Sequence, residues 1–277
     1  VLKDFEAVGI RSKTQMTEKV LQNSPHLNAI GCFCIGTNQV DLNSAKKLGI
    51  PVFNAPHSNT RSVAELVLCE IVALSRNLFD MSSKVHQGNW QKSAAGSYEV
   101  RGKTLGIVGY GHIGSQVSIL AEAFGLKVIY FDIVKKLPLG NSRQMASLEE
   151  LLKASDFVTL HVPETPETKN MIGSKEIKTM KKGSYLINAS RGSVVELEAL
   201  RDALNNGDLG GAAVDVYPSE PKKNSEGFET SLQNVKNVIL TPHIGGSTQE
   251  AQYKIGQEVS ESLDQFFTMG HTVGAVE

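Results

Sequence analysis

The sequence predicts an α/β protein with two doubly wound parallel-sheet domains. Its 277 residues suffice for two domains that each bury a core. Short apolar runs alternate with amphipathic segments of helical length, which is typical of parallel strands joined by helices. A glycine-rich turn also joins one apolar run to the next helix. The alternation and this turn are the observations on which the predicted fold class depends.

The smaller domain is predicted to comprise residues 1–57 and 246–277. Its predicted elements are strands at 7–10, 27–35 and 51–54, intervening helices at 14–24 and 41–48, and a closing helix at 248–268. Such an alternation predicts a flavodoxin-like sheet. Because the first strand lies so close to the start of the sequence, we expect this domain to be truncated at its N-terminus.

The larger domain is predicted to span residues 58–245 and to be a Rossmann domain. It opens with the longest helical candidate, 61–87, whose apolar residues lie on several faces and therefore need more than one partner, either within the monomer or in a second subunit. Six strands alternating with helices follow. These strands are predicted at 104–109, 127–132, 157–162, 184–190, 211–216 and 237–243.

A dinucleotide site is predicted at the turn after the first of these six strands. Gly109 allows a tight turn, Gly111 allows the backbone to approach a pyrophosphate, and Gly114 allows close packing of helix and strand. Asp132 ends the next strand, where its carboxylate can bind the adenosine ribose and repel a 2′-phosphate, which favours NAD over NADP. The alternative is a glycine-rich turn that binds nothing.

Four polar residues follow the later strands, at the edge of the sheet where α/β proteins bind ligands. Imidazole suits proton transfer near neutral pH, so His243 is the predicted acid and base, with Glu220 fixing its tautomer. Arg191 can bind a carboxylate with two hydrogen bonds, and Asp215 is expected to orient the nicotinamide end of the cofactor. Taken singly, an Arg after a strand is usually a surface residue, a Glu beside proline is usually part of a turn, and a His after proline is usually structural.

Composition excludes several other functions. The net charge is −1 and basic residues are scattered, so we do not expect nucleic-acid binding. The sequence has no long apolar run and no signal peptide, so we do not expect membrane binding either. The three cysteines, Cys32, Cys34 and Cys69, lie in apolar segments and predict reduced core thiols in a cytoplasmic protein, with no metal site.

The motifs GYGHIG, LHVPETPETKNMIG, LINASRG and LTPHIGGSTQEAQ closely resemble those of the D-isomer-specific 2-hydroxyacid dehydrogenases. The resemblance implies hydride transfer between NAD and a 2-hydroxy acid, with Arg191, Glu220 and His243 as the catalytic set. The NAD contacts that it implies, besides the three glycines, are His112, Ile113, Asp132, Ala189, Ser190, Asp215, Ile244, Gly245 and Gly246.

Within this family, segments such as IGCFCIGTNQVDL are similar to those of members that act on a phosphorylated three-carbon 2-hydroxy acid. The substrate contacts that this similarity implies are Arg11, Lys13, Gly36, Thr37, Asn38 and Lys92. It further implies a homodimer or homotetramer formed through 61–87 and the segment around Trp90. The alternatives are another 2-hydroxyacid dehydrogenase, such as a glyoxylate or hydroxypyruvate reductase, and a non-enzymatic NAD-sensing protein like the corepressors that share this fold.

Overall fold

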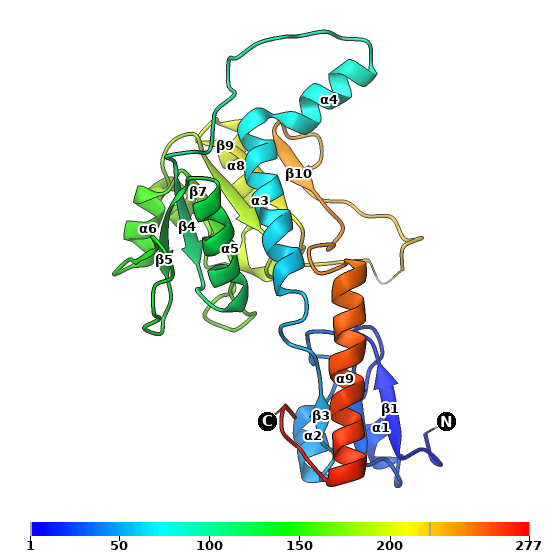
Figure 1. The fold of residues 1–277 in the computed structure, drawn as a ribbon. Helices are drawn as coiled ribbons and strands as arrows, with labels where there is room; N and C mark the ends of the chain where they lie inside the picture. Colours follow the sequence, from blue (N-terminus) through cyan, green and yellow to red (C-terminus); the bar gives the residue numbers. More distant parts are fainter. Residues whose placement is uncertain (1, 222, 277) are drawn as a thin grey trace. The chain divides into compact units, whose positions relative to one another are not determined.

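The computed structural model describes residues 2–221 and 223–276, which form two compact units (Figure 1). The smaller unit contains the residues up to 59 and those from 246 onward, and the larger unit contains residues 60–245. The chain passes between the units at 59/60 and at 245/246, and the boundaries predicted from the sequence were 57/58 and 245/246.

The smaller unit is built on three parallel strands in the order β1-β2-β3. Its elements are β1 (Ala7–Ile10), α1 (Glu18–Gln22), β2 (Ala29–Cys32), α2 (Leu42–Lys47), β3 (Val52–Phe53) and α9 (Gln249–Met269). The Thr248 side chain caps α9 by accepting a hydrogen bond from the Ala251 N–H at 3.1 Å. A β-carbon at Gly31 would lie 2.8 Å from Leu263, so glycine lets α9 pack closely on β2.

The larger unit is built on a seven-stranded parallel sheet in the order β10-β9-β8-β7-β4-β5-β6. The strands are β4 (Thr104–Val108), β5 (Lys127–Phe131), β6 (Arg143–Gln144), β7 (Phe157–Leu160), β8 (Ser184–Asn188), β9 (Leu209–Val214) and β10 (Val238–Leu240). The strand order reverses between β4 and β7, which creates a ligand-binding crevice at their carboxyl ends. The expectation of six strands was wrong, because β6 has only two polar residues and no apolar pattern that sequence could reveal.

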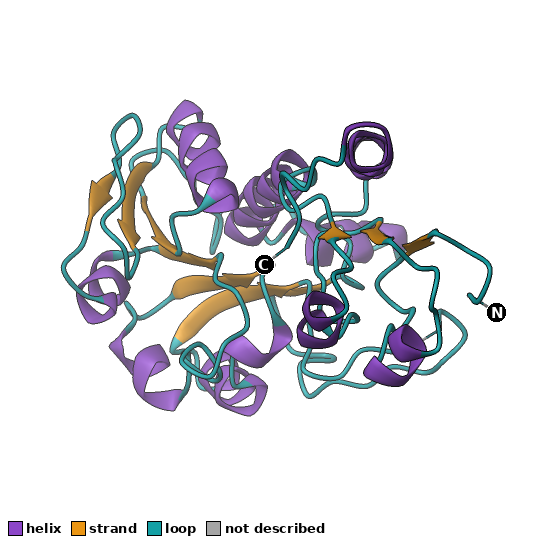
Figure 2. Ribbon diagram, turned by 90° about the horizontal axis from the view of Figure 1, so that it is seen from below, coloured by secondary structure: helices purple, strands orange, loops and turns teal. Residues whose placement is uncertain are grey.

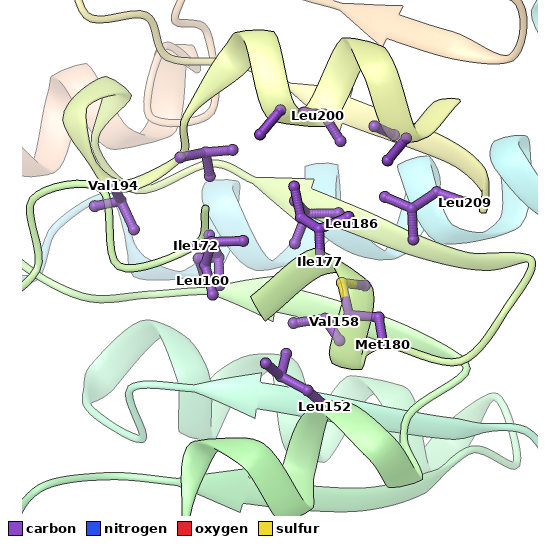
Figure 3. Packing of buried hydrophobic residues seen from close by; sticks show 14 of the residues in the cluster. Leu152, Val158, Leu160, Ile172, Ile177, Met180, Leu186, Val194, Leu200 and Leu209 are labelled. Atoms are coloured by element: carbon purple, nitrogen blue, oxygen red, sulfur yellow. The ribbon is translucent and has the colours of Figure 1, made fainter. Parts of the chain in front are cut away.

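Helices cover both faces of this sheet (Figure 2). On one face Val158, Leu160 and Leu186 pack against helices α6, α7 and α8 (Figure 3). On the other face the alternate residues, such as Ile107 and Ile187, pack against α3 and α5. These helices are α3 (Thr60–Arg76), α5 (His112–Ala123), α6 (Leu148–Ala154), α7 (Ser174–Thr179) and α8 (Leu197–Asn205). The predicted α/β class with a Rossmann domain is therefore confirmed.

The single long helix expected over 61–87 was wrong. The chain forms α3 and then α4 (Leu78–His86), separated by Asn77, whose φ of 48° is left-handed. Asparagine tolerates this conformation better than most residues. Helix α3 is buried in its own unit, whereas no residue of α4 is buried and α4 extends away from the sheet (Figure 1). The apolar periodicity thus continues past the point where the core ends.

Two further observations concern the chain as a whole. Among the described residues, no helix combines the length and apolar character needed to cross a membrane. Cys32 is buried and Cys34 is half-buried, but Cys69 is exposed on α3, so the expectation of three core thiols was wrong for Cys69. The face of α3 that carries Cys69 points away from the sheet because the opposite faces contact α5 and the strands.

Candidate active site

The larger unit brings the predicted catalytic residues to one edge of its sheet. Strand β8 ends three residues before Arg191, β9 ends directly before Asp215, and β10 ends three residues before His243. Strands β8, β9 and β10 are neighbours in the sheet and all run in the same direction. Their carboxyl ends therefore place these loops beside one another.

His243 and Glu220 form an acid–imidazole pair. The His243 Nδ1 lies 3.0 Å from Glu220 Oε1 and 2.9 Å from Oε2. This hydrogen bond raises the pKa of His243 above its usual value, although partial burial opposes the rise. Burial alone would raise the pKa of Glu220, but the hydrogen bonds from His243 and from the Tyr217 N–H lower it overall. With Nδ1 donating to Glu220, Nε2 is the nitrogen free to exchange a proton with a ligand.

The loop that carries His243 is held in an uncommon conformation by Asp215. His243 has a φ of 54°, in the left-handed region that non-glycine residues seldom occupy. The Asp215 carboxylate is only 1% exposed and accepts hydrogen bonds from Thr241 Oγ1 (2.6 Å), Ile244 N–H (2.8 Å) and Gly245 N–H (2.8 Å). Both of its oxygens thus shape the loop, and its expected role in orienting the cofactor stays a prediction.

Arg191 supplies a positive charge beside this pair. Its side chain is exposed, and Nη1 donates to the Ser190 carbonyl at 2.7 Å. The guanidinium contributes to lowering the pKa of Glu220 and also opposes protonation of His243. The three side chains therefore lie within electrostatic reach of one another, where a carboxylate could bind the guanidinium beside the imidazole.

The glycine loop between β4 and α5 is shaped for a dinucleotide. Gly109 has a φ of 90°, and a β-carbon there would overlap the His161 carbonyl oxygen. A β-carbon at Gly114 would overlap the Gly109 carbonyl oxygen, whereas one at Gly111 would have no neighbour within 4 Å. The first and third glycines are therefore needed for packing, and the second leaves open space at the N-terminus of α5. That space fits a pyrophosphate, which the helix dipole stabilises.

Asp132 is fixed next to this loop. Its Oδ2 accepts a hydrogen bond from the Tyr110 N–H and its Oδ1 accepts one from the Val134 N–H, at 2.8 and 2.9 Å. The Tyr110 ring stacks on Tyr130 at 3.8 Å between centroids, which joins the glycine loop to β5. The carboxylate is thereby placed to accept hydrogen bonds from a ribose.

His161 is a half-buried residue beside the same loop that the sequence did not single out. Burial lowers its pKa to about 3, so the ring is neutral at physiological pH. Its Nε2 lies 3.0 Å from Thr159 Oγ1, while Nδ1 is buried with no partner among the described residues. An orphaned polar atom next to Gly109 is a further feature that a bound dinucleotide could satisfy.

The remaining predicted site residues lie in both units. In the larger unit, Ala189 and Ser190 are buried after β8, His112 and Ile113 open α5, Ile244 follows His243, and Lys92 is exposed in the segment after α4. The smaller unit contains Arg11, Lys13, Gly36, Thr37, Asn38 and Gly246. Among the described residues, no group of three or more His, Cys, Asp or Glu side chains is arranged to hold a metal ion.

Several residues that organise the site were missed from the sequence. Thr241 bonds Asp215, and the Tyr217 hydroxyl donates toward the carbonyls of Val214 and Thr241, which joins the ends of β9 and β10. Their signal in the sequence is weak, because Tyr217 only follows the predicted strand at 211–216 and Thr241 lies within the one predicted at 237–243.

Comparison with known proteins agrees with this geometry. Residues 68–245 match the family described as D-isomer specific 2-hydroxyacid dehydrogenase, NAD binding domain. A D-3-phosphoglycerate dehydrogenase of Dictyostelium discoideum is 58% identical over 99% of this chain and 68% of the relative. The D-3-phosphoglycerate dehydrogenase of Escherichia coli K12 is also 58% identical, over 99% of this chain and 67% of the relative. The chain thus spans about two thirds of the length of these relatives.

Solved structures give the same result. The structure of D-lactate dehydrogenase from Aquifex aeolicus, complexed with NAD and lactic acid, is 35% identical with a TM-score of 0.86 and covers 100% of this chain and 89% of that one. The chain therefore belongs to the D-isomer specific 2-hydroxyacid dehydrogenase family, and its larger unit contains the NAD-binding domain of that family.

Proposed function

We propose that the chain catalyses the NAD-dependent oxidation of D-3-phosphoglycerate to 3-phosphohydroxypyruvate, the first step of serine biosynthesis. The observation that carries the proposal is the His243–Glu220 pair, at 2.9 Å, beside the Arg191 guanidinium. The high identity to D-3-phosphoglycerate dehydrogenases supports this substrate. A side activity in reducing 2-oxoglutarate belongs to the same proposal.

The chain's own residues would perform the proton transfer and bind the substrate. In oxidation, His243 Nε2 accepts the proton of the C2 hydroxyl, and the Glu220 carboxylate stabilises the resulting imidazolium. In reduction the same imidazolium returns the proton to the carbonyl oxygen. Arg191 binds the substrate carboxylate through two N–H groups and fixes the position of C2. NAD, when held by the glycine loop and Asp132, supplies the hydride acceptor.

We propose that the loop after β2 also binds the substrate carboxylate, through the main-chain N–H groups of residues 36–38. The carbonyls of Ile35 and Gly36 accept hydrogen bonds from the side chains of Asn54 and Gln39, at 2.5 and 3.3 Å. In residues 2–221 and 223–276, no hydrogen bond to the protein uses the main-chain N–H groups of residues 36–38. Free N–H groups on a loop whose carbonyls are tied back favour anion binding.

The phosphate group would require cations, and we propose Arg11 and Lys13 for this role, with Lys92 as a further ligand. Arg11 is exposed, donates to Gln252 at 2.6 Å, and lines a cavity of about 390 Å³ within the smaller unit. Replacing Arg11 and Lys13 with Ala should raise KM for phosphorylated substrates and leave that for glyoxylate unchanged. Equal effects on both substrates would reject the phosphate role.

Steady-state NADH oxidation against a panel of 2-oxo acids tests the function. We expect the highest kcat/KM with 3-phosphohydroxypyruvate. A preference for glyoxylate or unphosphorylated hydroxypyruvate would instead identify a reductase of those acids. Negligible turnover together with NADH-dependent dimerisation would identify an NAD-sensing binding protein.

We also propose that the chain is a cytoplasmic homodimer or homotetramer that associates through α4 and the segment after it. No residue of α4 is buried, and Phe79, Val85 and Trp90 are 54%, 55% and 82% exposed. Large apolar side chains gathered on one exposed segment are typical of subunit interfaces. Helix α3, which was expected to share this role, is largely covered within its own unit.

A further inference from the structure

Asn188, the last residue of β8, binds the loop that carries Arg191 through its side chain. The side chain is buried, since the residue is 1% exposed. Its Nδ2 donates to the Arg191 carbonyl at 3.0 Å, and its Oδ1 accepts from the Ser190 N–H at 3.1 Å and from Ser190 Oγ at 2.9 Å. The partners in all three hydrogen bonds lie within the next three residues of the chain.

This pattern requires an amide at position 188. An Asn oxygen that accepts the N–H two residues later forms an Asx-turn, which takes the place of a backbone turn. Aspartate could form the same turn but could not donate to the Arg191 carbonyl, and alanine could do neither. The Arg191 carbonyl also accepts the Val194 N–H at 3.3 Å, so two donors fix this peptide.

Contacts with neighbouring segments also restrict the position of the loop that carries Arg191. A β-carbon at Gly192 would overlap the main chain of Tyr217, so the loop presses directly on the segment that leads to Glu220. The main-chain carbonyl of Asn188 accepts the Asp215 N–H at 3.0 Å, which joins the same residue to the support of the His243 loop. Asn188 therefore contacts the loop of Arg191 directly and, through its carbonyl, the aspartate that holds the loop of His243.

The Arg191 side chain itself has little to hold it. Within the described part of the chain, its one hydrogen bond is to the adjacent Ser190 carbonyl. The direction of the guanidinium is thus set by the main chain from which it extends. We propose that Asn188 is a positioning residue for Arg191, which rests on the proposed function: it fixes the peptide at 190–191 so that the guanidinium meets the carboxylate of a 2-oxo acid.

The test combines Asn188→Ala and Asn188→Asp with a double-mutant cycle. The loss of three hydrogen bonds predicts that Asn188→Ala lowers kcat/KM for the preferred 2-oxo acid by roughly tenfold to a hundredfold, mainly through KM, with the Kd for NADH changed by less than about threefold. Asn188→Asp keeps the turn but sets a buried carboxylate against the Arg191 carbonyl, so it should not restore the wild-type kcat/KM. In an Arg191→Ala background, adding Asn188→Ala should have less than about a threefold further effect.

A matched control is Asn141→Ala. The Asn141 side chain also bridges main-chain groups, donating to the Leu126 carbonyl and accepting from the Val128 N–H, both at 3.2 Å, but at the opposite end of the sheet. Asn141 is exposed and forms two such hydrogen bonds instead of three, so Asn141→Ala should lower the unfolding temperature less than Asn188→Ala and should leave KM unchanged. Equal losses from Asn188→Ala in the wild-type and Arg191→Ala backgrounds would overturn the proposal, and so would no loss in the wild type.

Hydrogen exchange gives a readout that needs no activity. In Asn188→Ala, the peptide covering residues 189–194 should exchange faster, whereas peptides from β9 and β10 should not change. If the wild-type chain reduces no 2-oxo acid, the proposed function fails while this measurement still tests Asn188. Unchanged exchange in residues 189–194 would refute the positioning role.

Discussion

Glu70 provides a quantitative test of how the core beneath the active site is stabilised. This residue of α3 is 2% exposed, and neither carboxylate oxygen has a hydrogen-bond partner among the described residues. Burial, together with the nearby Asp215 carboxylate, raises the pKa of Glu70 from 4.5 to about 8. The perturbation that tests this is Glu70→Gln, which keeps the size of the side chain and cannot ionise.

The magnitude and sign follow from proton linkage. Between pH 4.5 and about 8, Glu70 is protonated in the folded chain and ionised in the unfolded chain. The wild type should therefore lose stability as the pH rises through this window. Each pKa unit corresponds to about 1.4 kcal/mol, which gives an upper limit of roughly 5 kcal/mol above pH 8 and about 3 kcal/mol at pH 7. Glu70→Gln should show no such loss, and its advantage over the wild type should therefore grow with pH.

The assay is urea unfolding followed by far-ultraviolet circular dichroism, without NAD, at pH values from 5 to 9. The control is Glu65→Gln on the same helix, because Glu65 is exposed and paired with Arg61 at 2.6 Å. Its effect should be small and constant over this range. A stability difference between Glu70→Gln and the wild type that stayed flat from pH 5 to 8 would refute the reasoning.

Three further predictions concern the proposed catalytic and cofactor sites. Glu220→Gln replaces the charged acceptor that raises the pKa of His243 with a neutral one. Reduction needs the imidazolium, so the fall of kcat at alkaline pH should move to lower pH, and an unchanged profile would count against the pair. Gly114→Ala should lower both the unfolding temperature and NADH affinity, whereas Gly111→Ala should lower affinity alone, as measured by thermal denaturation and NADH titration. Asp132→Ser should raise KM for NADH about tenfold and improve the use of NADPH, and an unaltered cofactor ratio would reject the role of Asp132.

The sequence was sufficient for six of the seven strands of the larger sheet and for the edge where the site lies. Parallel strands joined by helices all end at the same edge, so Arg191, Asp215 and His243 could be placed together once the strands before them were recognised. The roles of the three glycines could also be separated, since a Rossmann turn imposes a different steric demand on each.

The features that sequence did not reveal depend on tertiary contacts. The apolar pattern of 61–87 continues across Asn77, and only the position of the core shows that the helix breaks there. The two-residue strand β6 exists because it pairs with β5, not because of its own residues. The hydrogen bond from Thr241 to Asp215 is likewise invisible until β10 is placed beside β9.

The conformation of His243 shows how residues far apart in sequence act together. A left-handed φ at a non-glycine residue costs about 1–3 kcal/mol and persists only where surrounding contacts fix it. Pro242 limits the preceding backbone, and the buried Asp215 carboxylate offsets the strain through its bonds to Thr241 and to the N–H groups after His243. The imidazole therefore faces Glu220 because of an aspartate at the end of the adjacent strand, and the geometry of proton transfer depends on β9 as much as on the loop that contains the histidine.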